Sequence, residues 1–277
     1  MHDTSEQNTI ANLQTFDGEL LFKTRALCGS LEIRERDGLR WMHFGSEAVQ
    51  SAMLVRAPYF PVVPYTQFML GSLLFQNLPH NILLLGLGGG GLYRFFFQHY
   101  FPDAGITAVE RDPQFIEVAQ RYFNVSGDAE HHVTAVDDAA NFLVTTAPAG
   151  YDLLLADLFD IDRFSEIYRN EEFYSRCSRT LGEPGIGVFN LLVRDADDFE
   201  FVLQLIREHF NRHTLVSAVP DYRNIIVFAF KKAPVARRRE QFNEVADKLR
   251  HETGFNFSFV IDQLFENNPV AHSKLVI

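Results

Sequence analysis

The chain has 277 residues, of which 47% are hydrophobic and 13% aromatic, so it can bury a substantial core. Its formal net charge of −11 argues against generic nucleic-acid binding and suits a soluble protein. The two cysteines, Cys28 and Cys177, support neither a disulfide framework nor a cysteine-based zinc site, and they favour a reducing compartment such as the cytoplasm.

The N-terminal part of the chain divides into a tail and a β-rich region. Residues 1–17 are polar and acidic, without the basic end and apolar block of a signal peptide, and predict a flexible tail. Residues 18–64 carry β-branched and aromatic residues between turn signals, and predict a small domain of β-hairpins. No apolar run reaches the roughly 20 residues that span a bilayer, so no membrane partner is expected.

Strand and helix patterns alternate through residues 65–232. Seven short apolar or β-branched runs predict strands at 82–85, 106–109, 132–136, 151–156, 185–191, 213–219 and 224–231. Helical patterns lie at 66–75, 113–122, 139–145, 171–181 and 196–210. This order predicts an α/β fold with a doubly wound, seven-stranded, mostly parallel sheet of Rossmann type and an antiparallel edge. Residues 233–277 begin with an arginine run, expected on a solvated helix face, and predict a helical extension.

A glycine turn follows the first strand of this region. Gly86, Gly88 and Gly91 satisfy the pattern G-x-G-x-x-G, which allows a tight turn and close approach of the backbone to a ligand. Glu110 ends the next strand, where a carboxylate can accept hydrogen bonds from ribose hydroxyls. The motif predicts binding of an adenosine-containing ligand, but it does not separate dinucleotides from AdoMet-type ligands.

Acidic residues also follow the third and fourth strands. Asp137 and Asp138 come after one strand, and Asp157 and Asp160 after the next. Each could serve as a helix cap or turn residue, but ligands of open α/β sheets bind outside the carboxyl ends of the strands. We therefore expect carboxylates from separate segments to converge on one ligand. No histidine has partners at a recognisable metal-ligand spacing, so no metal is predicted.

Four segments together resemble the spermidine and spermine synthase family. They read LLLGLGGGGLYR, TAVERDPQFIEVAQRYF, VDDAANFL and YDLLLADLFD, and the resemblance covers roughly residues 38–230. Members of this family are aminopropyltransferases that share the fold of class I AdoMet-dependent methyltransferases. The resemblance implies transfer of an aminopropyl group from decarboxylated AdoMet to a small amine, release of methylthioadenosine, and a homodimer.

The resemblance also implies roles for individual residues. On the donor side, Gln50 resembles a glutamine that touches the aminopropyl donor, Glu110 the ribose acid, and Asp138 the acid that holds the adenine amino group. On the acceptor side, Tyr65 resembles the substrate tyrosine. Asp157 and Asp160 match the two aspartates of the family's D-S/T-S/T-D-P motif, which makes Asp157 the general base.

Several positions depart from the family pattern. Gly89 stands where the glycine loop normally has an aspartate, so one partner for the donor's amine is missing. Residues that normally help to hold the polyamine, or that complete the aspartate motif, are replaced by Thr66, Gln67, Leu158, Phe159 and Ile161. The donor half of the site therefore keeps more of the family pattern than the acceptor half.

Asp157 can act as a base if its surroundings raise its pKa. The sequence assigns that effect to the apolar neighbours Leu158 and Phe159 and to the charge of Asp160. Three alternatives to aminopropyl transfer remain at this point: an AdoMet-dependent methyltransferase of the same fold, a non-catalytic binder of an adenosyl ligand, and a nicotinamide dehydrogenase.

Overall fold

The computed structural model describes residue 10 and residues 13–26, 29–76, 79–100, 103–126, 132–160 and 163–277. At positions 98, 99, 132–135, 160, 163 and 164 it describes the backbone alone. Most of the expected N-terminal tail, together with Cys28 and Ile161, lies outside the described residues.

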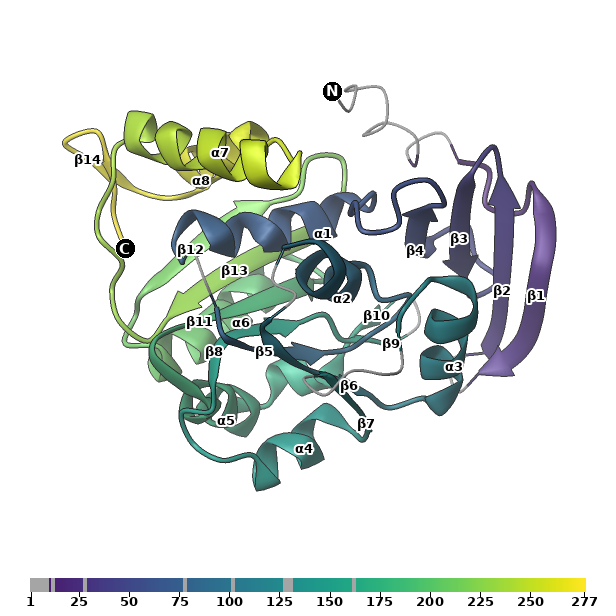
Figure 1. The fold of residues 1–277 in the computed structure, drawn as a ribbon. Helices are drawn as coiled ribbons and strands as arrows, with labels where there is room; N and C mark the ends of the chain where they lie inside the picture. The colour runs from purple at the N-terminus through teal and green to yellow at the C-terminus, as the bar shows by residue number, and fades with distance from the viewer. Residues whose placement is uncertain are drawn as a thin grey trace.

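An antiparallel sheet forms from residues 19–54, as the turn signals of this region predict (Figure 1). Its strands are β1 (Glu19–Ala26), β2 (Gly29–Arg36), β3 (Leu39–His43) and β4 (Val49–Leu54), in that spatial order. Its apolar face, with Leu31, Ile33 and Met53, packs against Phe115 and Phe123, which lie in and just after helix α3 (Pro113–Tyr122). This contact joins the small sheet to the main body of the molecule.

The central sheet is mostly parallel, as expected from the alternation of strands and helices. Its strands are β5 (Asn81–Leu85), β6 (Gly105–Glu110), β7 (His132–Val136), β8 (Tyr151–Ala156), β11 (Leu181–Leu192), β12 (Thr214–Ala218) and β13 (Asn224–Phe230). They lie in the order β12-β13-β11-β8-β5-β6-β7, and β13 runs antiparallel to both of its neighbours. The runs ILLL of β5 and LLLA of β8 pair side by side at its centre. They are wholly apolar because both faces of these strands are covered.

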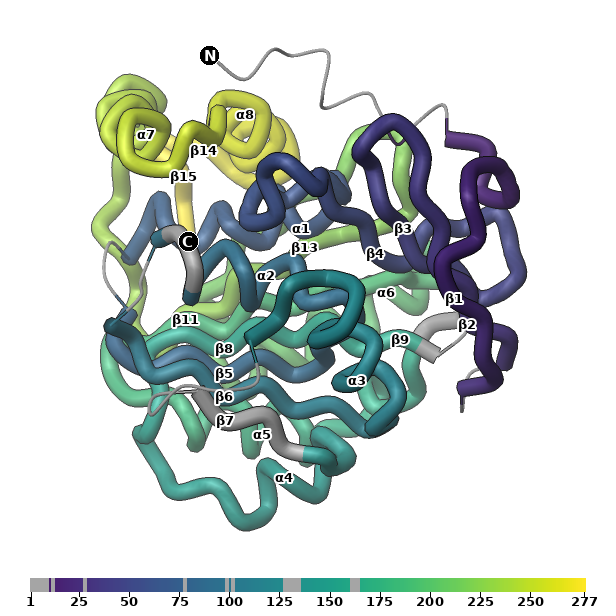
Figure 2. The backbone as a smooth tube through the Cα atoms, turned by 45° about the vertical axis from the view of Figure 1, so that its right-hand side comes forward, coloured from purple at the N-terminus to yellow at the C-terminus, as the bar shows by residue number. Residues whose placement is uncertain are grey.

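Helices cover both faces of the central sheet (Figures 1 and 2). One face carries α1 (Pro64–Met69), α2 (Gly91–Arg94), α7 (Arg239–Thr253) and α8 (Ser258–Asn267). The opposite face carries α4 (Ala139–Thr145), α5 (Glu171–Thr180) and α6 (Ala196–His209). Among the described residues, no helix is long and apolar enough to cross a membrane.

Short elements complete the chain and refine the expected pattern. The helix expected at 66–75 is divided into α1 and the 3-10 helix η1 (Leu70–Leu74), and α2 continues as the π-helix η2 (Phe95–Tyr100). The sequence pattern did not predict the pairs β9 (Phe159–Asp160) with β10 (Arg163–Phe164) and β14 (Val270–Ala271) with β15 (Lys274–Leu275), or the 3-10 helix η3 (Glu166–Arg169).

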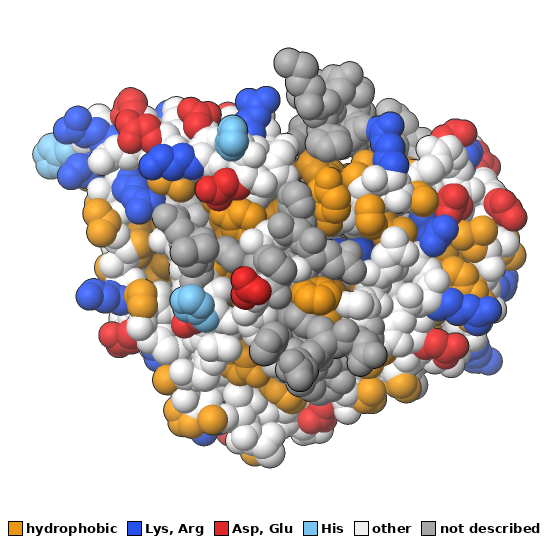
Figure 3. Space-filling view, viewed as in Figure 1, with side chains coloured by type: hydrophobic (Ala, Val, Ile, Leu, Met, Phe, Trp, Pro, Cys, Tyr) orange, Lys and Arg blue, Asp and Glu red, His pale blue; other side chains and the backbone are white. Residues whose placement is uncertain are grey.

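The arginine run at the start of the extension is not simply a solvated helix face. Arg237 donates a hydrogen bond to the Leu74 carbonyl over 2.7 Å, and Arg239 pairs with Asp262 of α8. Figure 3 shows side chains of both charges mixed over α7 and α8. The arginines therefore help to fasten the extension to the body of the protein.

Candidate functional site

The glycine turn after β5 brings two strand ends into close contact. Gly86 has a φ of +93°, and its N–H donates to the Val109 carbonyl over 2.8 Å. A Cβ atom at Gly86 would lie 2.2 Å from the carbonyl oxygen of Asp157. Only glycine can occupy this position without moving the backbone of Asp157.

The Glu110 carboxylate lies directly against this turn. Its Oε2 accepts hydrogen bonds from the N–H groups of Leu87 and Gly88, at 3.1 and 3.4 Å, and its Oε1 accepts one from Asp112 at 3.0 Å. Because the side chain projects from the carboxyl end of β6, it connects the turn with the neighbouring strand. Glu110 is thus held at the edge of the sheet where ligands of α/β folds bind.

Asp138 lies at the carboxyl end of β7 and caps α4. Its Oδ1 accepts a hydrogen bond from Ala140 N–H over 2.9 Å, while Asp137 accepts one from the N–H of Asp138 over 2.8 Å. Capping orients the Asp138 side chain at the helix N-terminus, and it leaves the second carboxylate oxygen available for another donor.

One cavity brings together the three carboxylates that the sequence places at separate strand ends. It has a volume of about 310 Å³, and its lining includes Gly86, Glu110, Asp138 and Asp157. A neighbouring cavity of about 90 Å³ is lined by Asp157 together with Gln50, Tyr65 and Gly88, and Gly91 lines a third, of about 30 Å³, which also contains Asp157. Asp157 is common to all three cavities. The side chain of Asp160 lies outside the described part of the structure.

Asp157 has an unusual electrostatic environment for a carboxylate. Burial raises its pKa from 3.8 to about 6, and the charge of Glu110 acts in the same direction. Hydrogen bonds from Asn190 and Tyr65 oppose the rise in the pKa because they favour the charged form. Burial is therefore the main cause of the raised pKa of Asp157, as expected from its apolar neighbours Leu158 and Phe159. The charge of Glu110 adds to this effect, which the sequence alone did not suggest.

Asn190 and Tyr65 are the polar side chains that act on the Asp157 carboxylate. Asn190 Nδ2 donates to Asp157 Oδ1 over 2.8 Å, whereas the Tyr65 hydroxyl donates to the Gln50 carbonyl over 3.3 Å and favours the charged form of the nearby carboxylate. Burial raises the pKa of Tyr65 well above 10, and the Asp157 charge raises it further, so the phenol stays protonated as a donor. The carboxylate is thus held by the Asn190 amide and lies beside a neutral phenol.

Two residues of this network did not emerge from the sequence analysis. Asn190 is fully buried in β11, and its Oδ1 accepts a hydrogen bond from Asn224 Nδ2 over 2.9 Å. The signal that could have revealed Asn190 is a single amide within the apolar run IGVFNLL. Tyr168 was also missed. Its hydroxyl accepts from Leu158 N–H and donates to the Ala156 carbonyl, both over 3.1 Å, and so fixes the chain on either side of Asp157.

The positions that depart from the family pattern have structural roles here. A Cβ at Gly89 would lie 2.3 Å from Ser51 Oγ, so Ser51 occupies the space that a longer side chain would need. Thr66 Oγ1 donates to the Val63 carbonyl over 2.6 Å, and Gln67 Nε2 donates to the Pro61 carbonyl over 2.8 Å. Both side chains are buried and stabilise the start of α1.

A larger cavity, of about 600 Å³, lies beside the cavity that contains Asp157, Gln50 and Tyr65. The two share Gln50, Tyr65 and Phe159, and the larger one also reaches Asn224. It therefore borders Tyr65 and, through Asn224, the hydrogen-bond chain that leads by way of Asn190 to Asp157. In the described part of the chain, no group of three or more His, Cys, Asp or Glu is arranged to hold a metal ion.

Known proteins resemble this chain over most of its length. A family model described as the spermine/spermidine synthase domain matches residues 63–239. The polyamine aminopropyltransferase of Chromobacterium violaceum is 30% identical over 247 residues, which cover 89% of this chain and 94% of that protein.

Solved structures share the fold. A probable spermidine synthase from Corynebacterium glutamicum has a TM-score of 0.69 at 18% identity, covering 93% of this chain and 99% of the other. A spermidine synthase in complex with the transition state analogue AdoDATO has a TM-score of 0.65 at 19% identity, covering 88% and 83%. The resemblance noted in the sequence is confirmed: the chain belongs to the spermine/spermidine synthase family.

Proposed function

We propose that this protein transfers an aminopropyl group from decarboxylated AdoMet to an amine and releases methylthioadenosine. The relative that aligns with 89% of the chain is named a polyamine aminopropyltransferase, and a structural neighbour was solved with AdoDATO. The observation that carries the proposal is the position of Asp157: its buried carboxylate lines the cavity that contains Glu110 and Asp138, and its neighbour Tyr65 lines the larger cavity beside it.

The cavity of about 310 Å³ has the chemistry that an adenosyl group requires. Glu110 would accept hydrogen bonds from the ribose hydroxyls, and Asp138 would accept one from the adenine amino group. Gln50 and the glycine turn, with Gly86, Gly88 and Gly91, would contact the rest of the donor. The positive sulfonium makes the adjacent propyl carbon electrophilic, and negative side chains nearby favour binding of this cation.

Asp157 would provide the base. An alkylammonium must lose a proton before its nitrogen can attack the carbon, and the raised pKa of Asp157 makes it a stronger base than an ordinary aspartate. The ammonium first gives one proton to Asp157; the neutral nitrogen then attacks, and as the N–C bond forms the C–S bond breaks, its electron pair remains on sulfur and the product nitrogen becomes a secondary ammonium. Tyr65 would orient both the carboxylate and the incoming amine, and alignment of the two reactants supplies much of the rate. The family resemblance assigns Asp160 to the same aspartate motif as Asp157.

Methyl transfer is not favoured as the main activity, because the aligned relative that covers nearly the whole chain is an aminopropyltransferase. We also propose that the protein acts in the cytoplasm as a homodimer. The composition supports the first of these statements and the family resemblance supports the second.

Asp157→Asn tests the proposed function. With decarboxylated AdoMet and a diamine, release of methylthioadenosine should fall by about 10²–10⁴-fold, because asparagine cannot accept the proton. Binding of methylthioadenosine, measured by calorimetry, should change little. The matched control is Asp247→Asn, an exposed position on α7, which should keep full activity.

The same variant should not unfold more easily than the wild type at pH 8. The native-state pKa of Asp157 lies near 6, above the ordinary value of 3.8, so ionising the buried carboxylate costs stability as the pH rises from about 4 to 6. A neutral asparagine avoids that cost. An Asp157→Asn protein that folds and retains normal turnover would overturn the assignment of the base.

A further inference from the structure

The large cavity beside the catalytic carboxylate exceeds the needs of a short diamine. Its volume of about 600 Å³ lies within the range of about 300–1,000 Å³ that holds drug-sized ligands. Tyr65 and Asn224 line it at the side that leads to Asp157. An amine that reacts at Asp157 would therefore extend the rest of its chain into this space.

Part of the lining that includes Tyr65 is apolar. Val49, Val63, Phe159 and Leu192 belong to it, the Phe159 ring centroid lies 5.9 Å from that of Tyr65, and methylene groups can bury their surface against such side chains. Thr66 and Gln67, the side chains that follow Tyr65, are uncharged, and both are buried and donate to backbone carbonyls, so they offer no negative partner to a second ammonium. A second positive charge close to the reacting amine would find little compensation on this wall.

Two carboxylates line this cavity but none of the cavities that Asp157 lines, and both lie on exposed turns. Glu47 belongs to the turn between β3 and β4, and Asp221 to the turn between β12 and β13. Within the described part of the chain, neither carboxylate takes part in a hydrogen bond or ion pair. Arg223 also lines the cavity and donates to the Val193 carbonyl over 3.1 Å. Because the lining has two carboxylates and one guanidinium, the three charged side chains together are negative.

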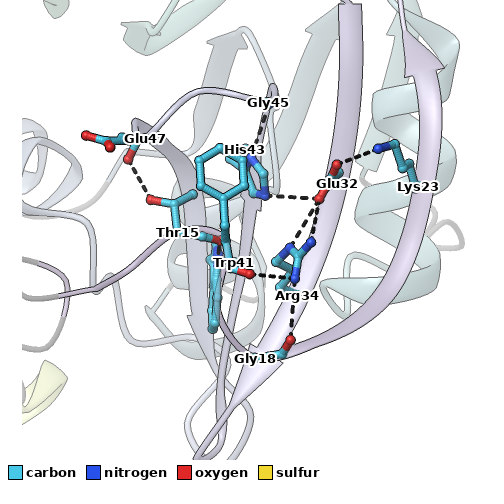
Figure 4. Close-up of polar contacts among 10 residues, drawn as sticks. Thr15, Gly18, Lys23, Glu32, Arg34, Trp41, His43, Gly45 and Glu47 are labelled. Carbon is cyan, nitrogen blue, oxygen red and sulfur yellow. Dashed lines mark hydrogen bonds and ion pairs between the residues drawn. The ribbon is translucent and has the colours of Figure 1, made fainter.

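Hydrogen bonds to neighbouring segments hold the turn that carries Glu47. Thr15 Oγ1 donates to the Glu47 carbonyl over 2.6 Å, and Trp41 Nε1 in turn donates to the Thr15 carbonyl over 2.9 Å. His43 Nδ1 accepts a hydrogen bond from Gly45 N–H over 3.1 Å. Figure 4 shows the Glu47 carboxylate directed away from this cluster. The backbone is thus anchored, and Glu47 is one of the residues that line the large cavity.

We propose that the acceptor is a long amine whose second ammonium lies farther from the reacting nitrogen than in putrescine, and that Glu47 and Asp221 bind this distant charge. The inference rests on the proposed function and names the acceptor class of the same site. Methylene groups would cover the apolar wall, and the two turns, from the small sheet and the central sheet, would select the length of the acceptor.

The test measures kcat/KM for putrescine, 1,6-diaminohexane, 1,8-diaminooctane and octylamine with decarboxylated AdoMet. The value should rise by about tenfold from putrescine to the best long diamine, equivalent to about 1.4 kcal/mol, and octylamine should lack most of this gain. In the Glu47→Gln/Asp221→Asn double variant, the loss should be about tenfold greater for the long diamine than for putrescine. Added salt should weaken the preference, because both carboxylates are exposed.

The matched control is Glu19→Gln, an exposed position on β1 away from the cavity lining, which should leave the whole series unchanged. Turnover that is fastest with putrescine, or a length preference that survives the double variant, would overturn the acceptor inference alone. If no amine yields methylthioadenosine, the proposed function itself fails, and the acceptor class fails with it.

Discussion

Asp157 is held by a chain of two buried amides that begins in a different part of the sheet. Asn224, at the start of β13, donates to Asn190 in β11, which donates to Asp157 after β8. Because an asparagine amide donates with nitrogen and accepts with oxygen, the chain has one direction. Both amides therefore point their donors toward the carboxylate and favour its charged form.

The first prediction concerns this chain of amides and the pH dependence of the reaction. In the wild type, kcat/KM should fall as the pH drops through about 6, because Asp157 must be ionised to accept a proton. Asn190→Leu removes a hydrogen bond to the charged form, so the pKa of Asp157 should rise further. The fall of kcat/KM at low pH, the acidic limb of the pH profile, should then shift to higher pH by about one unit, as expected for loss of a hydrogen bond to a charged group.

Asn224→Leu provides the comparison, since it touches Asp157 only through Asn190 and should cause a smaller shift. Full pH profiles of both variants distinguish positioning from a general structural defect. If Asn190→Leu lowers kcat/KM equally at every pH and the limb stays in place, Asn190 does not tune the carboxylate.

At the scale of elements, one buried arginine joins three segments around the glycine turn. Arg94 ends α2, and its guanidinium donates to the carbonyls of Gly89, Pro58 and Phe123, the last two over 2.6 and 2.8 Å. Burial lowers its pKa to about 9. Hydrogen bonds from Arg94 thus hold together the glycine turn, the segment before α1 and the end of α3.

Arg94→Met should lower the free energy of unfolding by about 3 kcal/mol. It leaves three carbonyls without their donor, and each buried unsatisfied group costs about 1–3 kcal/mol, while removal of a buried charge offsets part of that loss. Urea unfolding measures the change, with Arg250→Met on the exposed face of α7 as a control expected within about 0.5 kcal/mol of the wild type. An Arg94→Met protein as stable as the wild type would show that the free-energy cost of burying the charge cancels the gain from its three hydrogen bonds.

At the scale of the whole molecule, the residues that line the cavities and the helices that support the sheet belong to different layers. The small sheet supplies Glu47 and Gln50 and the central sheet supplies Asp157, whereas no described residue of α7 or α8 lines the cavities around Asp157. The two helices instead belong to the hydrophobic core on one face of the central sheet, which includes Phe228 and Phe230 of β13. Phe242 of α7 lies 5.4 Å from Phe75, measured between ring centroids.

Phe242→Ala should therefore destabilise the protein without changing the site. The side chain is fully buried, and truncation of a buried phenylalanine costs about 3–5 kcal/mol. KM for donor and acceptor, measured well below the melting temperature, should stay close to the wild type. Val235→Ala, at a largely exposed position, should leave the melting temperature unchanged. A rise in KM as large as the loss of stability would place α7 in the site.

The sequence alone predicted the succession of elements and the edge of the sheet at which the carboxylates meet. The bounds predicted at 113–122, 139–145 and 151–156 coincide with α3, α4 and β8, because apolar periodicity and capping residues act locally. Glu110, Asp138 and Asp157 could be expected in one place because parallel strands end at the same edge.

Only the tertiary structure decided how that site is held and tuned. The bond from Asn190 to Asp157, the contact of Ser51 with Gly89, and the turn that brings Glu47 to the cavity each join segments that are far apart in the sequence. The degree of burial that raises the pKa of Asp157 also depends on every segment packed around it. Local patterns encode which elements form, whereas burial and hydrogen bonding between distant segments exist only once those elements have packed.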